Sequence, residues 1–365
     1  MAQSSPVANA AWANRVPLRI SRRLPIGAEV QPDGGVHFRV SAPSRKTVEV
    51  ALRRPTADGD ARPESTESSL NLKREPDGYF SGFTADSAAG DRYGFRLDDE
   101  EKVYPDPASR FQPDGPHGLS QVVDPSRFPW RDNGWQGPSR KGQINYELHI
   151  GTFTPEGTFA AAIAKLPLLG ELGITLLELM PVAEFDGRFG WGYDGVDLFA
   201  PTRLYGEPDS FRRFVDEAHR LGLGVILDVV YNHFGPTGNY LAQFSNHYTS
   251  RKHKTDWGEA INFDAEDNCP VREFFTTNAG YWIDEFHIDG LRLDAIHAIV
   301  DDSSDHIVAA ITRRVREAAG GRKALVVVEN ERQQPHVLRD TTDGGCCVDA
   351  AWNDDFHHAA RVAMT

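Results

Sequence analysis

Hydrophobic and polar residues alternate with a period of two in the first part of the chain, between about residues 27 and 100. The apolar positions of this pattern are Val36, Phe38 and Val40, then Val48, Val50 and Leu52, then Tyr93, Phe95 and Leu97. Turn-forming residues, such as Pro-Asp-Gly-Gly at 32–35, separate the runs. This pattern is typical of antiparallel strands that bury one face. We therefore predict an all-β sandwich over residues 21–115.

The pattern changes after the sandwich. Residues 116–142 are rich in Pro, Gly and Asp and show no periodicity, which predicts a connecting segment. From residue 143 to residue 365, short apolar runs alternate with helical stretches, as in parallel β/α units. The expected strands span residues 144–149, 175–180, 224–229, 287–294, 324–329 and 348–352.

The helical stretches support the same architecture. One buried stripe is predicted for Val271, Phe274, Phe275, Ala279, Trp282 and Phe286, which recur at spacings of three and four. Pro167 lies inside the first helical stretch and predicts a kink or a late helix start. A closed (β/α)8 or TIM barrel has eight strands, so six strands predict an incomplete barrel with two unpaired edges. The expected fold is multi-domain: an all-β sandwich followed by a partial α/β TIM barrel over residues 143–365.

The amino-acid composition narrows the classes of binding partner that we expect. The formal net charge of −14 would repel phosphate backbones and anionic headgroups, so we expect neither nucleic acid nor membrane as a partner. The first twenty residues contain no apolar signal-peptide core, and no run of 18 apolar residues occurs, which favours a cytoplasmic location. The three cysteines, which include the adjacent pair Cys346 and Cys347, show neither metal-ligand spacing nor a disulfide framework.

Polar residues end three of the predicted strands. The segments are Asp-Val-Val-Tyr-Asn-His at 228–233, Gly-Leu-Arg-Leu-Asp-Ala at 290–295 and Val-Val-Val-Glu-Asn at 326–330. Barrel enzymes carry their reacting groups at the carboxyl ends of the strands. We therefore expect a functional site where these three segments meet.

These three segments, in this order, resemble the first three sequence regions of the α-amylase family of glycoside hydrolases. The segments at 146–159, 190–201 and 233–241 narrow the resemblance to the trehalohydrolases of that family. The resemblance implies retaining hydrolysis of the α-1,4 bond next to the trehalose end of maltooligosyl trehalose, with release of trehalose. It also implies that the sandwich is the immunoglobulin-like, carbohydrate-binding-like module that precedes the barrel in related enzymes.

The resemblance implies that Asp294 is the nucleophile and Glu329 the general acid and base. The two residues end consecutive predicted strands, and a strand spacing of about 4.8 Å suits the ~5–5.5 Å carboxylate separation of a retaining mechanism. Arg292 lies two residues before Asp294 on the same face of the strand. We expect it to hold Asp294 ionised through charge-assisted hydrogen bonds.

Further residues match family positions around the bound sugar. Tyr193 would offer a stacking face, whereas Asp194, Asp228 and His233 would form hydrogen bonds. Tyr193 and Asp194 could instead be loop anchors.

Additional candidates are expected near the mouth of the barrel. His297 follows the nucleophile strand, and the segment with Asp354 and His357 resembles a trehalohydrolase segment. His357 could instead be a packing or solvated helix residue. Asn232 matches a position that binds calcium in some amylases, but no carboxylate cluster completes an oxygen cage, so we expect no metal and no cofactor.

The family pattern breaks near the end of the sequence. The family carries a third catalytic Asp in a fourth region, and no matching segment occurs before Thr365. Asp354 and Asp355 lie too close to the Glu329 strand to replace it. We therefore expect a fragment of a longer protein or a frame-disrupted gene product.

Two other functions fit the sequence. A glycogen branching or debranching enzyme of the same family would use the same Asp294 and Glu329 with a different acceptor, but the segments at 146–159 and 190–201 speak against it. A non-catalytic glucan-binding remnant is the second. The favoured hypothesis implies a pathway partner, maltooligosyl trehalose synthase, which makes the substrate.

Overall fold

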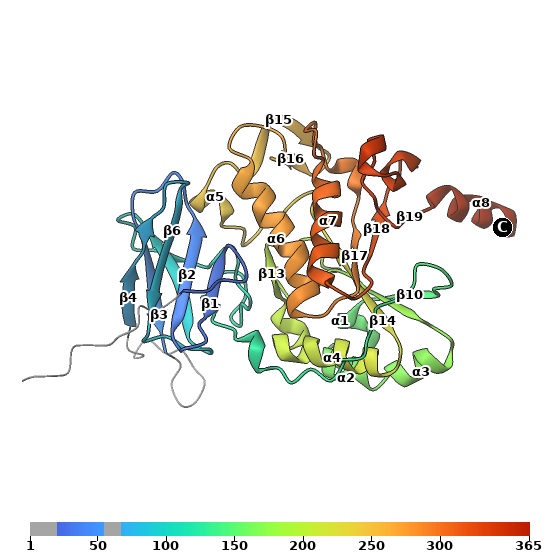
Figure 1. The fold of residues 1–365 in the computed structure, drawn as a ribbon, viewed down its shortest axis with the longest axis horizontal. Helices are drawn as coiled ribbons and strands as arrows, with labels where there is room; N and C mark the ends of the chain where they lie inside the picture. Colours follow the sequence, from blue (N-terminus) through green and yellow to red (C-terminus); the bar gives the residue numbers. More distant parts are fainter. Residues whose placement is uncertain (1–19, 55–66) are drawn as a thin grey trace, which may run out of the picture.

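The computed structural model describes residues 20–54 and 67–365 (Figure 1). Nearly all of the segment in which we expect no signal peptide, and residues 55–66 of the predicted sandwich, lie outside the described residues. Figure 1 shows a β-sheet unit formed by the first part of the chain beside a larger unit of strands and helices. No helix in the described ranges combines the length and the apolar character that a membrane span requires.

The N-terminal unit contains two antiparallel sheets. The first has the order β1 (Gly27–Val30), β2 (Val36–Ser41), β6 (Tyr79–Thr84) and β5 (Lys73–Arg74). The second has the order β4 (Glu67–Asn71), β3 (Val48–Arg53), β7 (Arg92–Leu97) and β8 (Val103–Tyr104). Phe38 and Phe80 from the first sheet and Phe95 from the second are buried in one hydrophobic core. The predicted alternation is thus the pattern of two sheets that pack face to face.

The second sheet continues into the segment predicted as a connection. The short strand β9 (Ser120–Gln121) pairs with β7, and the 3-10 helix η1 (Pro125–Arg127) follows it. The boundary at residue 115 stays a prediction.

The larger unit is built on a curled sheet of six parallel strands that pair in chain order. The strands are β10 (Asn145–Leu148), β11 (Leu176–Leu179), β14 (Gly224–Val229), β17 (Gly290–Leu293), β18 (Leu325–Glu329) and β19 (Ala350–Trp352). All six predicted strands are present. Within the described residues, β10 and β19 each have one neighbour, so the sheet is open at both edges.

One strand is shorter than predicted. β17 begins at Gly290 rather than at His287, since His287 has a positive φ of 52° and cannot continue an extended strand. The Asp289 carboxylate instead accepts a hydrogen bond from the backbone N–H of Val225 at 2.9 Å. This side chain links the segment just before β17 to the start of β14.

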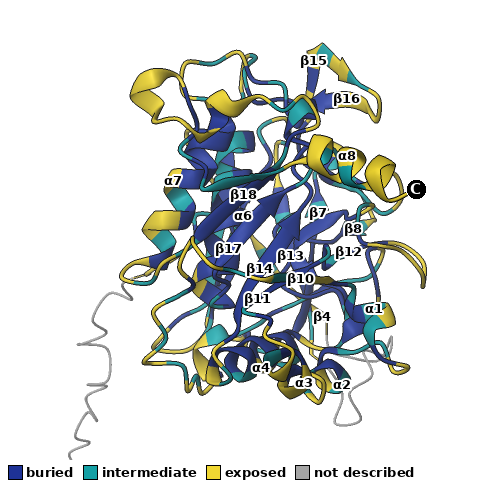
Figure 2. Ribbon diagram, turned by 90° about the vertical axis from the view of Figure 1, so that its right-hand side faces the viewer, coloured by how far each residue is buried: buried dark blue, intermediate teal, exposed yellow. Residues whose placement is uncertain are grey.

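Eight α-helices are present among the described residues, and several of them cover the outer face of the sheet. They are α1 (Ile150–Phe153), α2 (Phe159–Ile163), α3 (Leu166–Glu171), α4 (Pro208–Arg220), α5 (Leu241–Phe244), α6 (Cys269–Glu285), α7 (Ile307–Ala319) and α8 (Asp354–Met364). Pro167 lies in the first turn of α3, which confirms the predicted late helix start. The predicted stripe of α6 is buried. α8 has no buried residue, and Figure 2 draws it largely in the colour of exposed residues.

Alternation along the strands separates an outer face from an inner face. Leu227, Leu293 and Val328 point outward and join the large core under the helices. Ile226 and Val327 point inward and form a small cluster of their own. The inner-face positions become polar towards the carboxyl ends of the strands, which places charged side chains together at one end of the sheet.

Two hairpin-like sheets lie outside the main sheet. β12 (Ala183–Glu184) pairs with β13 (Asp197–Pro201), and β15 (Thr249–Thr255) pairs with β16 (Gly258–Ile261). The remaining 3-10 helices are η2 (Arg203–Tyr205), η3 (Ile296–Ala298), η4 (Pro335–Leu338) and η5 (Thr341–Asp343).

A buried ion triad fastens the connecting segment to the sheet. His219 on α4 contacts Asp132 through Nδ1 at 2.9 Å and Asp289 through Nε2 at 2.8 Å. Burial lowers the pKa of His219, but the two carboxylates outweigh this effect and raise the pKa above its ordinary value. Burial alone would raise the pKa of Asp132. The hydrogen bonds of its carboxylate to histidine outweigh burial and hold the pKa well below its ordinary value.

The triad predicts a pH dependence of stability. The unfolded chain releases the histidine proton near pH 6.5, whereas folded His219 keeps it to higher pH, so the free energy of unfolding should fall as pH rises above about 6.5. Asp132 adds the opposite loss in acid, where its carboxylate becomes protonated. Urea unfolding from pH 5 to 9 should show a shallower decline above pH 6.5 for His219→Gln than for the wild type and for the exposed control His358→Gln. Equal slopes would contradict the assignment.

Candidate active site

Arg292 on β17 lies at the centre of the polar inner face. Its Nη1 donates to Oδ1 and Oδ2 of Asp228 at 3.0 and 3.1 Å and to Oδ1 of Asp294 at 2.7 Å. Its Nη2 lies 3.2 Å from Oε2 of Glu329. One guanidinium therefore contacts carboxylates from three neighbouring strand ends, which is where the sequence predicted a site.

Strand register brings Asp294 and Glu329 together. β17 and β18 pair Leu293 with Val328, so the next residues along both strands are Asp294 and Glu329. Neighbouring strands are about 4.8 Å apart, and the two side chains project to the same face. The side chain of Asp294 is 14% exposed and that of Glu329 is 30% exposed. Both carboxylates are thus held by the protein and still open to a ligand.

Hydrogen bonds orient both carboxylates. Asn232 Nδ2 donates to Oδ2 of Asp294 at 2.8 Å, so each oxygen of this carboxylate has a donor. Ala295 has a left-handed backbone with φ of 40°, which is uncommon for a residue other than glycine. Its backbone N–H donates to Oε2 of Glu329 at 2.9 Å. The sharp turn after β17 therefore links the orientation of Glu329 to the strand that carries Asp294.

Asp228 is the buried member of the group. Burial raises the pKa of Asp228 to about 8, although the charge of Arg292 opposes the shift. The Tyr193 hydroxyl donates to Oδ2 of Asp228 at 2.9 Å, and burial raises the pKa of Tyr193 as well. Burial alone would lower the pKa of Arg292. The surrounding carboxylates outweigh burial and raise this pKa above its ordinary value. The guanidinium is therefore a permanent positive charge in the site.

His233 connects the neighbouring loops. Its Nε2 lies 2.9 Å from the backbone oxygen of Tyr193, and its Nδ1 contacts the Asn232 side chain. The exposed indole ring of Trp257, on the β15–β16 turn, stacks on the imidazole with ring centroids 5.6 Å apart. His233 thus holds Asn232, the donor to Asp294, in place.

The other sequence-predicted residues lie apart from this group. Asp194 is exposed next to Tyr193, and His297 on η3 pairs with Glu331 at 3.3 Å. Asp354 and His357 are on α8, and among the described residues no hydrogen bond or ion pair joins either side chain to Arg292 or its partners. Substrate contact by these residues stays a prediction.

Glu178 on β11 is a member of the inner face that the sequence reasoning missed. Its carboxylate is buried, with Oε1 3.9 Å from Nε of Arg292. Burial raises the pKa of Glu178. A charged residue inside the run Leu-Leu-Glu-Leu was the available signal, since such a residue in a buried strand needs a partner.

Comparison with known proteins agrees with the geometry. Residues 102–262 match the family model described as the α-amylase catalytic domain. The chain is 44% identical over 333 residues to the malto-oligosyltrehalose trehalohydrolase of Saccharolobus solfataricus, covering 91% of this chain and 56% of that protein. Residues 102–262 therefore resemble the catalytic domain of the α-amylase family of glycoside hydrolases. The trehalohydrolase of Deinococcus radiodurans is 45% identical over 276 residues, covering 76% of this chain and 44% of that protein.

A solved structure extends the similarity to the fold. The crystal structure of a putative α-amylase from Salmonella typhimurium superimposes with a TM-score of 0.83 at 42% identity, covering 93% of this chain and 55% of that chain. The chain spans about half the length of the curated relatives it matches.

Proposed function

We propose that this protein takes part in releasing trehalose from maltooligosyl trehalose, as a retaining α-glycosidase. The observation that carries the proposal is the shared contact of Asp294 and Glu329 with one guanidinium at paired strand ends. A retaining mechanism needs two carboxyl groups ~5–5.5 Å apart. The names of the relatives in Saccharolobus and Deinococcus support the substrate class.

In the proposed reaction, Asp294 attacks the anomeric carbon on the non-reducing side of the α-1,4 bond. Glu329 gives a proton to the departing oxygen, so trehalose leaves and a covalent glycosyl-enzyme remains. Water then attacks this ester while Glu329 accepts a proton, which frees the maltooligosaccharide and restores both carboxyl groups. The donors Arg292 and Asn232 favour the ionised nucleophile and fix its direction of attack.

The remaining assignments belong to the same proposal. Tyr193, Asp228 and His233 would line the subsite of the cleaved sugar, supported by their contacts around Arg292 and Asn232. The N-terminal sheets would be an immunoglobulin-like module. The substrate would come from maltooligosyl trehalose synthase, and the reaction would take place in the cytoplasm.

The proposal is tested by incubating the 365-residue chain with maltotriosyl trehalose and measuring free trehalose. Free trehalose from the wild type, with a loss on the order of 10³-fold or more for Asp294→Asn, would support the proposal, since a nucleophile cannot be replaced by an amide. Asp305→Asn is the matched control because the Asp305 side chain forms an exposed ion pair with Arg313, away from the candidate active site.

The products also separate the alternatives. New α-1,6 branches from amylose would favour a branching enzyme, and linear chains released from a branched glucan would favour a debranching enzyme. A folded chain that binds maltooligosaccharides without turnover would contradict the catalytic proposal and favour a glucan-binding remnant.

A further inference from the structure

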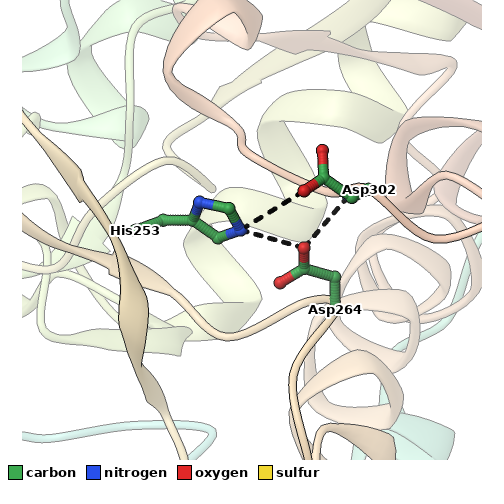
Figure 3. A group of neighbouring side chains, drawn as sticks. All are labelled: His253, Asp264 and Asp302. Atoms are coloured by element: carbon green, nitrogen blue, oxygen red, sulfur yellow. Dashed lines mark hydrogen bonds and ion pairs between the residues drawn. The ribbon is translucent and has the colours of Figure 1, made fainter.

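Three side chains that could ligate a metal ion meet away from the carboxylates around Arg292. Figure 3 shows His253, Asp264 and Asp302, whose nearest ligand atoms all lie within 4.8 Å of one another. Nε2 of His253 is 2.9 Å from Oδ2 of Asp264 and 3.8 Å from Oδ2 of Asp302. Among the described residues this is the one group of three or more His, Cys, Asp or Glu side chains with such spacing.

The three side chains come from separate segments. His253 lies on β15, Asp264 follows β16, and Asp302 lies between η3 and α7. The backbone N–H of Asp302 donates to Oδ2 of Asp264 at 3.2 Å, which holds the two segments together. The group therefore joins the β15–β16 hairpin to the connection that follows β17.

A cation already lies between the two carboxylates. Nζ of Lys252 is 3.0 Å from Oδ2 of Asp264 and 2.8 Å from Oδ2 of Asp302. The Lys252 side chain is about half exposed, so it can leave for water without losing a buried position. The positions of these oxygens thus suit a positive charge that can be exchanged.

The Asp264 carboxylate could bind a metal ion more strongly than it binds the lysine ammonium. Its side chain is only 2% exposed, and its second oxygen, Oδ1, is buried without a hydrogen-bond partner. Leaving a buried carboxylate oxygen unsatisfied is costly, and a metal ion bound by both oxygens would remove that cost.

We propose that His253, Asp264 and Asp302 form a binding site for a divalent transition-metal ion of the zinc class, which displaces the Lys252 ammonium. One imidazole and two carboxylates are a ligand set for Zn²⁺, with water in the fourth position. Ligand atoms around tetrahedral Zn²⁺ are about 3.3 Å apart, which lies between the 2.9 and 3.8 Å separations of His253 from the two carboxylates. Ca²⁺ is disfavoured because it takes 6–8 oxygen ligands.

The bound ion would stabilise the position of the β15–β16 hairpin. The turn of this hairpin carries Trp257, which stacks on His233 beside the candidate active site. A bound ion would tie the hairpin to the segment of Asp302 more firmly than an exposed lysine does. The sequence-based expectation of no metal considered the position of Asn232 and the spacing of the cysteines, and the proposed site lies elsewhere in the chain.

Isothermal titration of the EDTA-treated 365-residue chain with Zn²⁺ tests the site. We expect saturable binding of one ion, weakened about tenfold or more in both His253→Gln and Asp302→Asn, because each loses a ligand. Lys252→Met should bind more tightly by a few-fold, because the competing ammonium is gone. His247→Gln is the matched control, since His247 faces a single carboxylate, that of Asp267 at 3.6 Å.

The outcomes separate this site from non-specific binding. Zn²⁺ should raise the melting temperature of the wild type and of His247→Gln but not of Asp302→Asn, whose exposed position leaves the metal-free fold intact. Unchanged Zn²⁺ affinity in both ligand variants would overturn the proposal, and so would weaker binding in Lys252→Met. Equal binding of Ca²⁺ would overturn the assignment to the zinc class.

Discussion

Arg292→Met should lower the free energy of unfolding by about 3–5 kcal/mol, the cost of leaving buried charges without their partner. The guanidinium is the shared counter-charge of Asp294 and Glu329 and also donates hydrogen bonds to Asp228, and methionine fills a similar volume without a charge. Urea unfolding at pH 7 measures the effect.

The control for this prediction is Arg313→Met. Arg313 pairs with Asp305 at 2.8 Å, but both side chains are exposed, so we expect a change of about 1 kcal/mol or less. A loss for Arg292→Met no larger than that of the control would show that the carboxylates around Arg292 do not depend on its charge.

Glu285→Gln is the second substitution with a large expected effect, again about 3–5 kcal/mol. The Glu285 side chain is fully buried at the end of α6, where Arg110 Nη2 lies 3.1 Å from Oε1 and Arg212 Nη2 lies 3.8 Å from Oε2. Arg110 also lies 3.6 Å from Glu29 on β1. An amide at position 285 would leave two buried guanidinium groups short of negative charge and weaken the junction between the N-terminal sheets and the barrel unit.

The junction gives this prediction a second measurement. If the two units of Glu285→Gln separate before they unfold, the unfolding transitions followed by near-ultraviolet circular dichroism and by tryptophan fluorescence should have different urea midpoints. Glu317→Gln is the matched control, since Glu317 is exposed on α7 and lies 3.9 Å from Arg314. A Glu285→Gln variant as stable as this control would contradict the structural role of the ion network.

The order and nature of the strands were readable from the sequence, because they depend on local periodicity. The run at 224–229 was predicted with the bounds that β14 has. The late start of α3 followed from the fixed φ of Pro167. The start of β17 was misjudged, because the contact that ends the preceding turn, from Asp289 to Val225, joins segments 64 residues apart.

Some residues of the candidate site could be chosen from the sequence, and others could not. Asp228, Arg292, Asp294 and Glu329 could be chosen from the sequence because each is a polar group where an apolar run ends. Glu178 was missed because the residue after it, Leu179, is apolar again and hides the end of the inner face. Asn232 was considered only as a calcium ligand, yet the fold uses it as a hydrogen-bond donor to Asp294.

The sequence by itself determined the sheet-rich first part, the six parallel strands and the charged residues at the ends of those strands, since these features follow from the spacing of neighbouring residues. Only the tertiary structure decided that Arg292 contacts three carboxylates at once, that the backbone of Ala295 faces Glu329, and that His253 meets Asp302. The physical reason is that these contacts depend on strand register and loop paths, which are set by packing between segments far apart in the chain.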